Sequence, residues 1–185
     1  MVENLPPQTP DPSEKPFALR AVVFTAAFLL FILGLVPSIF HVVGQLIVSD
    51  TTFWGEARNF WRQFGALIGH SIFIIGLASY LFCSGWLIAL GRGPHVEFDP
   101  PKVFVATGPY RWVRNPVVIT LLVTALGEAI ALNSIGIFVL VLVGMPLAHL
   151  QVTKIEEPNL RGRFGQSYID YCSRVNRWLP SRPAD

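Results

Sequence analysis

Long apolar runs separated by polar segments give this chain its pattern. The first run covers about residues 21–48 and the second about 65–90, and neither contains Lys, Arg, Asp or Glu. Each can cross a bilayer as one helix, because about 20 apolar residues span its hydrocarbon core. A third run, about 117–152, is too long for one upright helix, and Asn133 with Ser134 near its middle predicts a tight turn. The pattern therefore predicts four membrane-spanning helices, the last two forming a helical hairpin.

Composition supports this fold class. The 185 residues are 52% hydrophobic and 14% charged, a balance that excludes an ordinary soluble domain. We therefore expect an all-α, polytopic membrane helix bundle whose surroundings are bilayer lipids, and we expect no nucleic-acid partner. Of the two cysteines, Cys83 lies in an apolar run and Cys172 in the polar C-terminal segment, so a reduced, cytoplasmic C-terminal segment is the simpler interpretation.

The distribution of basic residues predicts the orientation of the bundle. With both termini on one side of the membrane, 12 of the 14 Lys and Arg residues lie on that side, and Arg58 and Arg62 lie on the other. Because the basic side of a membrane protein is the cytoplasmic one, both termini and the polar segment 91–116 are expected in the cytoplasm. The protein is thus expected to be a multi-pass integral membrane protein, of the inner membrane if bacterial.

Two polar stretches flank the first span. Residues 1–17 are rich in proline and polar side chains, which predicts a disordered cytoplasmic tail, and residues 18–185 are expected to form one membrane domain. Residues 49–64 carry five aromatic side chains at near-helical spacing with two arginines between them. This spacing favours a short helix lying in the membrane interface; a connecting loop with aromatic anchors is the alternative.

The segment 107–116, TGPYRWVRNP, concentrates basic, aromatic and helix-breaking residues directly before the third apolar run. Asn115 and Pro116 are typical of a helix start, with asparagine as the cap and proline where its missing N–H costs nothing. The backbone N–H groups of such a start, together with Arg111 and Arg114, can hold a carboxylate or a phosphate. A lipid-facing basic loop with an aromatic anchor would contain the same residue types.

Two adjacent acids, Glu156 and Glu157, follow the last span, and Pro158 predicts a break in the helix there. Such a break would place both carboxylates at the membrane surface, near the arginines of segment 107–116. Beyond it, apolar residues recur every three or four positions and predict one amphipathic helix on the cytoplasmic side. These residues are Leu160, Phe164, Tyr168, Tyr171 and Val175, and the opposite face holds Arg161, Arg163, Asp170 and Arg174.

His149 lies seven residues before Glu156, so the two would share one face of a regular helix. With the hairpin turning at Asn133, His149 also reaches the depth of Asn115. This geometry predicts a pocket formed by His149, Asn115, Tyr110 and Glu156. A histidine that merely packs within the bundle is the alternative.

Three further polar residues lie near the opposite ends of the spans: His41, His70 and Glu128. An acid inside a membrane segment is a functional candidate, but the depth of the three favours a polar cluster that joins helices over a path for substrate. No Cys or His pattern has the spacing of a metal site, and no metal is expected.

Two blocks of sequence point to a family. The first comprises GRGP at 91–94, DPPK at 99–102 and GPYRWVRNP at 108–116; the second comprises EEPNL at 156–160 with Phe164, Gly165, Tyr168, Tyr171, Val175 and Pro180. In this order, with a hairpin between them, the blocks resemble the isoprenylcysteine carboxyl methyltransferase-like and phospholipid methyltransferase-like membrane enzymes. The resemblance covers roughly 91–180, about half of the chain.

The resemblance implies methyl transfer from S-adenosylmethionine, bound on the cytoplasmic side by residues 91–180, to an acceptor that arrives from the membrane. The family's cofactor segment, Arg-His/Asn-Pro-x-Tyr-x-Gly, is matched by Arg114, Asn115 and Pro116, whereas Val118 stands in place of the tyrosine and Thr120 in place of the glycine. In the prenylcysteine enzymes an arginine lies a turn before the glutamate pair, and this chain has Val152 and Lys154 in that region.

Site roles follow from the resemblance and the residue chemistry together. One glutamate of the pair can hold ribose hydroxyls or an ammonium group, and an arginine with nearby N–H groups can hold a carboxylate. His149 and Arg114 are the catalytic candidates, with His149 orienting the acceptor or taking its proton. The cofactor-binding candidates are Gly108, Pro109, Tyr110, Arg111, Arg114, Asn115, Pro116, Glu156 and Glu157.

The acceptor stays open between a carboxylate, an amine and a thiol on a lipophilic or small molecule. A catalytically silent membrane scaffold that uses the same fold for interaction is the alternative function, because Val118 and Thr120 depart from the family pattern. Binding of the cofactor separates this alternative from the enzyme.

Overall fold

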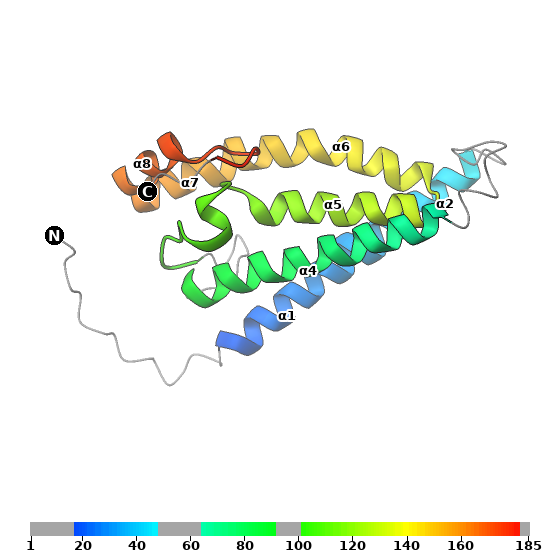
Figure 1. The fold of residues 1–185 in the computed structure, drawn as a ribbon, viewed down its shortest axis with the longest axis horizontal. Helices are drawn as coiled ribbons and strands as arrows, with labels where there is room; N and C mark the ends of the chain where they lie inside the picture. Colours follow the sequence, from blue (N-terminus) through cyan, green and yellow to red (C-terminus); the bar gives the residue numbers. More distant parts are fainter. Residues whose placement is uncertain (1–16, 48–63, 92–100, 182–185) are drawn as a thin grey trace.

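A computed structural model describes residues 17–47, 64–91 and 101–181, and all of its regular elements there are helical (Figure 1). The elements are α1 (Phe17–Leu29), η1 (Leu30–Leu35), α2 (Val36–Ile47), α4 (Ala66–Gly91), η4 (Gly108–Arg111), α5 (Pro116–Ala131), α6 (Ile135–Gln151), η5 (Val152–Glu156), α7 (Glu157–Phe164) and α8 (Gln166–Arg174). The predicted tail at 1–17 falls, except for Phe17, outside the described residues, as does nearly all of the predicted interfacial helix at 49–64.

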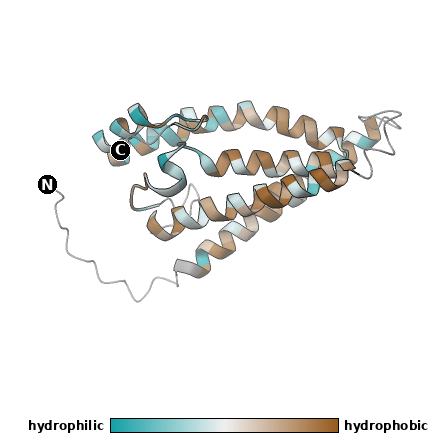
Figure 2. Ribbon diagram, in the orientation of Figure 1, coloured by the Kyte–Doolittle hydropathy of each residue, from teal (hydrophilic) through white to brown (hydrophobic). Residues whose placement is uncertain are grey.

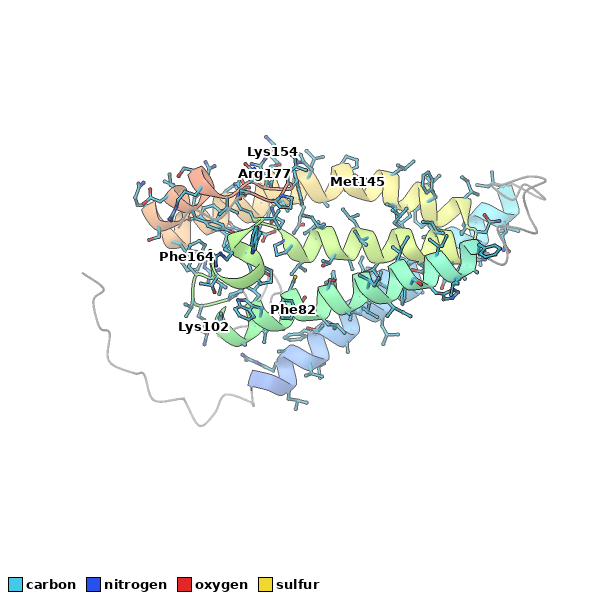
Figure 3. All side chains as sticks on the ribbon, viewed as in Figure 1. Phe82, Lys102, Met145, Lys154, Phe164 and Arg177 are labelled. Atoms are coloured by element: carbon cyan, nitrogen blue, oxygen red, sulfur yellow. The ribbon has the colours of Figure 1, made fainter. Side chains whose placement is uncertain are left out.

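The four predicted spans are confirmed as apolar helices. Three are long enough to cross a membrane, Leu19–Ile47, Ala66–Gly91 and Ile135–Phe164, and α5 is a shorter apolar helix. Figure 2 shows hydrophobic residues along the length of the bundle and hydrophilic ones gathered at the end that carries α7 and α8. Side chains such as Phe82 and Met145 stand on the outside of α4 and α6 (Figure 3), where they are exposed as expected for contact with lipid. The all-α membrane bundle is therefore the observed architecture.

The predicted hairpin turn between α5 and α6 is also confirmed. Asn133 adopts a left-handed backbone conformation with φ 48°, which asparagine tolerates better than most residues. Ser134 then caps α6, because its hydroxyl oxygen accepts a hydrogen bond from the backbone N–H of Ile137 at 3.3 Å. The ring of His41 reaches the same hydroxyl at 2.8 Å. Of the three polar residues predicted to cluster here, His41 thus joins α2 to the hairpin, whereas His70 hydrogen-bonds the carbonyl of Ala66 in its own helix.

Small residues allow α4 and α5 to pack with their backbones nearly in contact. A Cβ atom on Gly69 would lie 2.2 Å from the backbone nitrogen of Ala131, and one on Gly76 would lie 2.7 Å from the hydroxyl of Thr124. Gly127 approaches Phe73 in the same way, at 2.4 Å. Lipid tails are as apolar as the side chains of the helices, so burying apolar surface does little to bring two helices together in a membrane. Close packing of the helix backbones is therefore a principal source of their association.

We therefore expect Gly69→Ala to lower the free energy of unfolding by about 1–3 kcal/mol, because the new methyl group would overlap backbone that cannot move alone. Gly85→Ala in the same helix is the matched control, since a Cβ there meets nothing within 4 Å. Thermal unfolding in detergent measures both. A Gly69→Ala protein as stable as the control would show that α4 and α5 are farther apart than described.

The C-terminal apolar stripe packs as predicted, but on two helices. Tyr168, Tyr171 and Val175 are buried together, with Phe104, Leu160 and Phe164 against them. The Phe104 ring contacts both tyrosines edge-on, with centroids 5.9 and 5.3 Å apart. The single helix predicted for this stripe is wrong, because Gly165 has φ 54°, a conformation that ends α7 and turns the chain into α8. The turn at Gly165 places α8 against the 101–111 segment at the end of the bundle.

Candidate active site

Three charged side chains form a clamp at the polar end of the bundle. The carboxylate of Glu157 accepts hydrogen bonds from Arg114 Nη1 at 2.9 Å and from Arg177 Nε and Nη2 at 2.7 and 2.9 Å. The Glu157 side chain is 5% exposed, against 13% for Arg114 and 28% for Arg177. Two guanidinium groups around one buried carboxylate make this a strong, charge-assisted contact. The clamp joins the segment before α5, the start of α7 and the C-terminal segment.

The C-terminal segment 175–181, which we call the strap, runs back over the start of α5 (Figure 1). Its backbone carbonyls accept hydrogen bonds from the Arg114 backbone N–H and from the Asn115 side-chain amide, at 2.9 and 3.2 Å. At its far end the N–H and hydroxyl of Ser181 both donate to the carbonyl of Trp112. Asn115 thus stands at the predicted cap position of α5 without a side-chain capping bond. Its amide secures the strap instead, which corrects the predicted capping role.

Tyr110 lies in η4 beneath this assembly and is held at both ends. Its hydroxyl donates to the carbonyl of Cys83 at 3.4 Å, and its own carbonyl accepts from the hydroxyl of Tyr171 at 2.6 Å. Burial raises the pKa of Tyr110 above its usual range, so the phenol stays neutral. Gly108, two residues earlier, lets the backbone pass close to the Trp86 ring. It has φ 58°, and a Cβ atom at this position would overlap that ring. Segment 107–116 is therefore packed into the bundle through Gly108 and Tyr110, while Arg111 and Trp112 remain exposed.

Two cavities flank this polar centre. The first, about 490 Å³, lies between residues 101–105, α7 and α8, and polar atoms of Arg163 and Asn159 contribute to its walls. The second, about 570 Å³, lies at membrane depth between the N-terminal span, α5 and α6, and its walls are aliphatic or aromatic except at the end near the start of α5. Both volumes fall within the range of small-molecule sites. One cavity therefore faces the polar end of the bundle and the other faces the hydrocarbon region.

The two cavities meet at a shared wall, which we call the junction. Among the described residues, Leu87, Tyr110, Arg114, Gln151 and Glu156 line both. The junction therefore places a guanidinium, a carboxylate, a carboxamide and a phenol between the cavity at the polar end of the bundle, here called the polar cavity, and the cavity at membrane depth, here called the apolar cavity. Molecules held on either side of it would present their polar ends to the same groups.

A π-helical turn, η5, sets which side chains reach the junction. The predicted helix break at Pro158 is wrong, because the helix continues from α6 through η5 into α7. A π turn accommodates an extra residue per turn, and such turns are common at functional sites. The insertion shifts the helix phase, so Glu156 lines the cavities with Gln151, and Glu157 turns to the face that binds the strap.

The same phase shift corrects the predicted position of His149. In a regular helix His149 would align with Glu156, but beyond η5 it aligns with Glu157. Accordingly, the strap contacts both residues of that face: Arg177 binds Glu157, and Trp178 Nε1 donates to His149 Nδ1 at 3.0 Å. His149 lines neither of the two cavities described above. Its ring packs against Trp178 on the outside of the bundle, with centroids 6.0 Å apart.

The model of the family described as phospholipid methyltransferase matches residues 64–167, which is more than half of the chain. The chain belongs to the phospholipid methyltransferase family. No match was found among curated proteins or solved structures.

Family membership makes the protein a membrane methyltransferase and confirms the phospholipid methyltransferase resemblance. The matched region contains α4, α5, α6 and α7, and so all five junction residues and most of the wall of each cavity. It leaves out the N-terminal span, the strap and most of α8. The clamp thus joins two residues inside the match, Arg114 and Glu157, to Arg177 outside it.

The candidate residues of this phospholipid methyltransferase family member fall into three groups. Tyr110, Arg114 and Glu156 line both cavities, and Asn115 lines the apolar one. Glu157 is buried in the clamp and Pro116 at the start of α5. The remaining candidates line neither cavity and are Gly108, Pro109, Arg111 and His149. Metal-binding groups of three or more His, Cys, Asp or Glu residues do not occur in the part of the chain that the structure describes.

Gln151 is the polar junction residue that sequence reasoning missed, and Leu87 is the apolar one. Gln151 lies five residues before Glu156, a spacing that points the two side chains apart in a regular α-helix and brings them closer when a π turn intervenes. A polar residue at the end of an apolar run was the available signal. The packing of Phe104 against α8 was also missed, because nothing in segment 101–107 indicates its partner.

Proposed function

We propose that the protein is an S-adenosylmethionine-dependent methyltransferase whose acceptor is lipophilic and reaches the junction from the bilayer. The observation that supports this most directly is the meeting of a cavity at the polar end of the bundle with a cavity at membrane depth, at Tyr110, Arg114, Gln151 and Glu156. A donor and an acceptor of different polarity can then approach one another without leaving their preferred surroundings.

The residues of the polar cavity fit such a cofactor chemically. S-adenosylmethionine is a zwitterion whose sulfonium carries the transferable methyl group. Glu156 is suited to bind the ribose hydroxyls or the ammonium group, and Arg114 the carboxylate. Tyr110 contributes an uncharged aromatic ring to the cavity wall, because burial raises its pKa and keeps the phenol neutral. The aliphatic wall at Leu87 and Val103 can cover an adenine ring.

The chain's contribution to the reaction is alignment and the exclusion of water. Direct methyl transfer needs donor and acceptor in line, and a large part of its acceleration comes from this orientation. The clamp and the strap hold Arg114 against Glu157, which keeps one wall of the junction in place. The aliphatic walls of the second cavity keep water from the acceptor side. We place the junction on the cytoplasmic side, as the distribution of basic residues predicts.

Binding of S-adenosylhomocysteine to the purified protein in lipid nanodiscs tests this proposal. We expect saturable binding by calorimetry, and transfer of a labelled methyl group from S-adenosylmethionine into an extractable lipid fraction when membrane lipids are supplied. Label in a peptide or volatile fraction would identify a different acceptor. Absence of binding to the folded protein would refute the enzyme and favour the silent scaffold.

A further inference from the structure

The buried carboxylate of Glu157 is shared unequally between the two arginines of the clamp. Arg177 binds it with the Nε–Nη2 edge of its guanidinium, one hydrogen bond to each carboxylate oxygen, at 2.7 and 2.9 Å. Arg114 makes a single bond to it, from Nη1 to Oε1 at 2.9 Å. Two parallel bonds are the geometry in which a guanidinium and a carboxylate fit best. Arg177 therefore occupies both oxygens, and Arg114 shares only one of them.

The corresponding edge of the Arg114 guanidinium is unused. Its Nη1 also donates to the thiol sulfur of Cys172 at 3.1 Å, so one nitrogen makes both of these side-chain contacts. The Nε–H is buried and has no hydrogen-bond partner among the described residues. A buried donor without a partner is unfavourable, and a bound ion is one common explanation for it in a native protein. An anion bound beside Arg114, which lines both cavities, would supply the missing acceptor.

The two arginines compete for the same carboxylate. Without Arg177, Oε2 of Glu157 would lose its donor, and a buried carboxylate oxygen without a partner is costly. Arg114 is already bonded to Oε1, and a second bond to Oε2 would either use its Nη2 or turn its Nε toward Glu157. Each change removes a donor from the edge that is now free. The fork of Arg177 thus limits Arg114 to one bond with Glu157.

We propose that Arg177 is a positioning residue: by occupying both oxygens of Glu157, it keeps the Nε–Nη2 edge of Arg114 free to bind the carboxylate of S-adenosylmethionine. The identity of this anion rests on the proposed function, whereas the pairing of the three side chains does not. Arg177 lies outside the residues that the family model matches. The strap accordingly controls the charge that is available at the junction, in addition to packing against the bundle.

Two ligands that differ only in the carboxylate isolate this effect. S-adenosylhomocysteine and its decarboxylated analogue share the adenosine and the amine. In the wild-type protein in lipid nanodiscs, we expect calorimetry to show S-adenosylhomocysteine binding about tenfold to a hundredfold more tightly, the value of a hydrogen bond to a charged group. In Arg177→Gln we expect this preference to be lost, with the affinity for the analogue unchanged. A merely structural role of Arg177 would weaken both ligands alike.

Arg174→Gln is the matched control. It makes the same change at an exposed residue of α8 that lines neither cavity and whose Nε donates to the carbonyl of Asp170 in the same helix. We expect it to keep the wild-type preference. Adding Glu157→Gln to Arg177→Gln removes the carboxylate that would capture Arg114, so the double variant should recover the preference.

Gel filtration verifies the folding of each variant. If Arg177→Gln does not fold, Arg177→Lys replaces it, because a lysine keeps the charge but cannot form the fork. The preference for S-adenosylhomocysteine should then fall in the same direction. Equal affinity of the wild type for the two ligands, or a preference that Arg177→Gln or its lysine replacement retains, would overturn the positioning role.

The pairing is also tested without ligand, by NMR of the side-chain protons of Arg114 in isotope-labelled protein, assigned with Arg114→Lys. A second bond to Glu157 should move these signals downfield in Arg177→Gln, and the double variant should reverse the shift. Shifted signals in a protein that does not bind S-adenosylhomocysteine would refute the proposed function and leave the positioning role. Binding of S-adenosylhomocysteine with unshifted signals would do the reverse.

Discussion

Replacing Glu157 with glutamine is expected to lower the free energy of unfolding by about 3 kcal/mol or more, the usual result of removing one partner from a buried ion pair. The carboxylate is 5% exposed and accepts three hydrogen bonds from Arg114 and Arg177. A neutral amide cannot compensate two guanidinium charges, and its NH2 group would face a donor. Thermal unfolding in detergent measures the loss.

Asp170→Asn is the matched control for this change. It makes the same acid-to-amide replacement at an exposed position of α8, where the carboxylate accepts a hydrogen bond from the Gln166 side chain. We expect its stability to stay within about 0.5 kcal/mol of the wild type. In Glu157→Gln we also expect faster hydrogen exchange in the strap, because Arg177 loses its anchor. Equal stability and equal exchange in both variants would show that the clamp does not hold the strap.

Replacing Glu156 with glutamine is expected to weaken S-adenosylhomocysteine binding by about tenfold to a hundredfold, the value of a hydrogen bond to a charged group. Although adjacent in sequence to Glu157, this residue lines both cavities, whereas Glu157 serves the clamp. Calorimetry on the wild type and the variant measures the effect. The neutral amide keeps the shape of the side chain, so loss of affinity reports the charge.

Asp170→Asn again serves as the control, since it removes the same charge at an exposed residue that lines neither cavity. Its affinity should equal that of the wild type. If Glu156→Gln binds S-adenosylhomocysteine as tightly as the wild type and Asp170→Asn do, Glu156 has no part in holding the cofactor. The polar cavity would then need another anion to complement the ammonium group. Together the two neighbouring glutamates give a paired experiment, in which one variant loses stability and the other loses affinity.

Much of the fold could be predicted from local sequence. Runs without charge define membrane spans wherever they occur, because hydrocarbon excludes charged groups regardless of the neighbours. Asn133 and Ser134 defined the turn of the hairpin for an equally local reason, a left-handed residue followed by a helix cap. Gly165 carried such a signal as well, and the regular apolar spacing on both sides of it obscured the break between α7 and α8.

The site could be predicted less well because it depends on helix phase. Tyr110, Asn115 and Glu156 were expected in one pocket and line the cavities, yet His149 was expected there too and lies outside. A phase error of one residue rotates a side chain by about 100° on a helix of 3.6 residues per turn. The π turn introduces this shift.

By itself the sequence determined the class of protein, its helical hairpin and its family, since these depend on apolar length, turn residues and motifs that are contiguous in the chain. The tertiary structure decided which glutamate lines the cavities, that Arg177 completes the clamp, and that the N-terminal span walls the apolar cavity. These features depend on the packing of segments distant in sequence and on a single inserted helical residue, neither of which a one-dimensional pattern encodes.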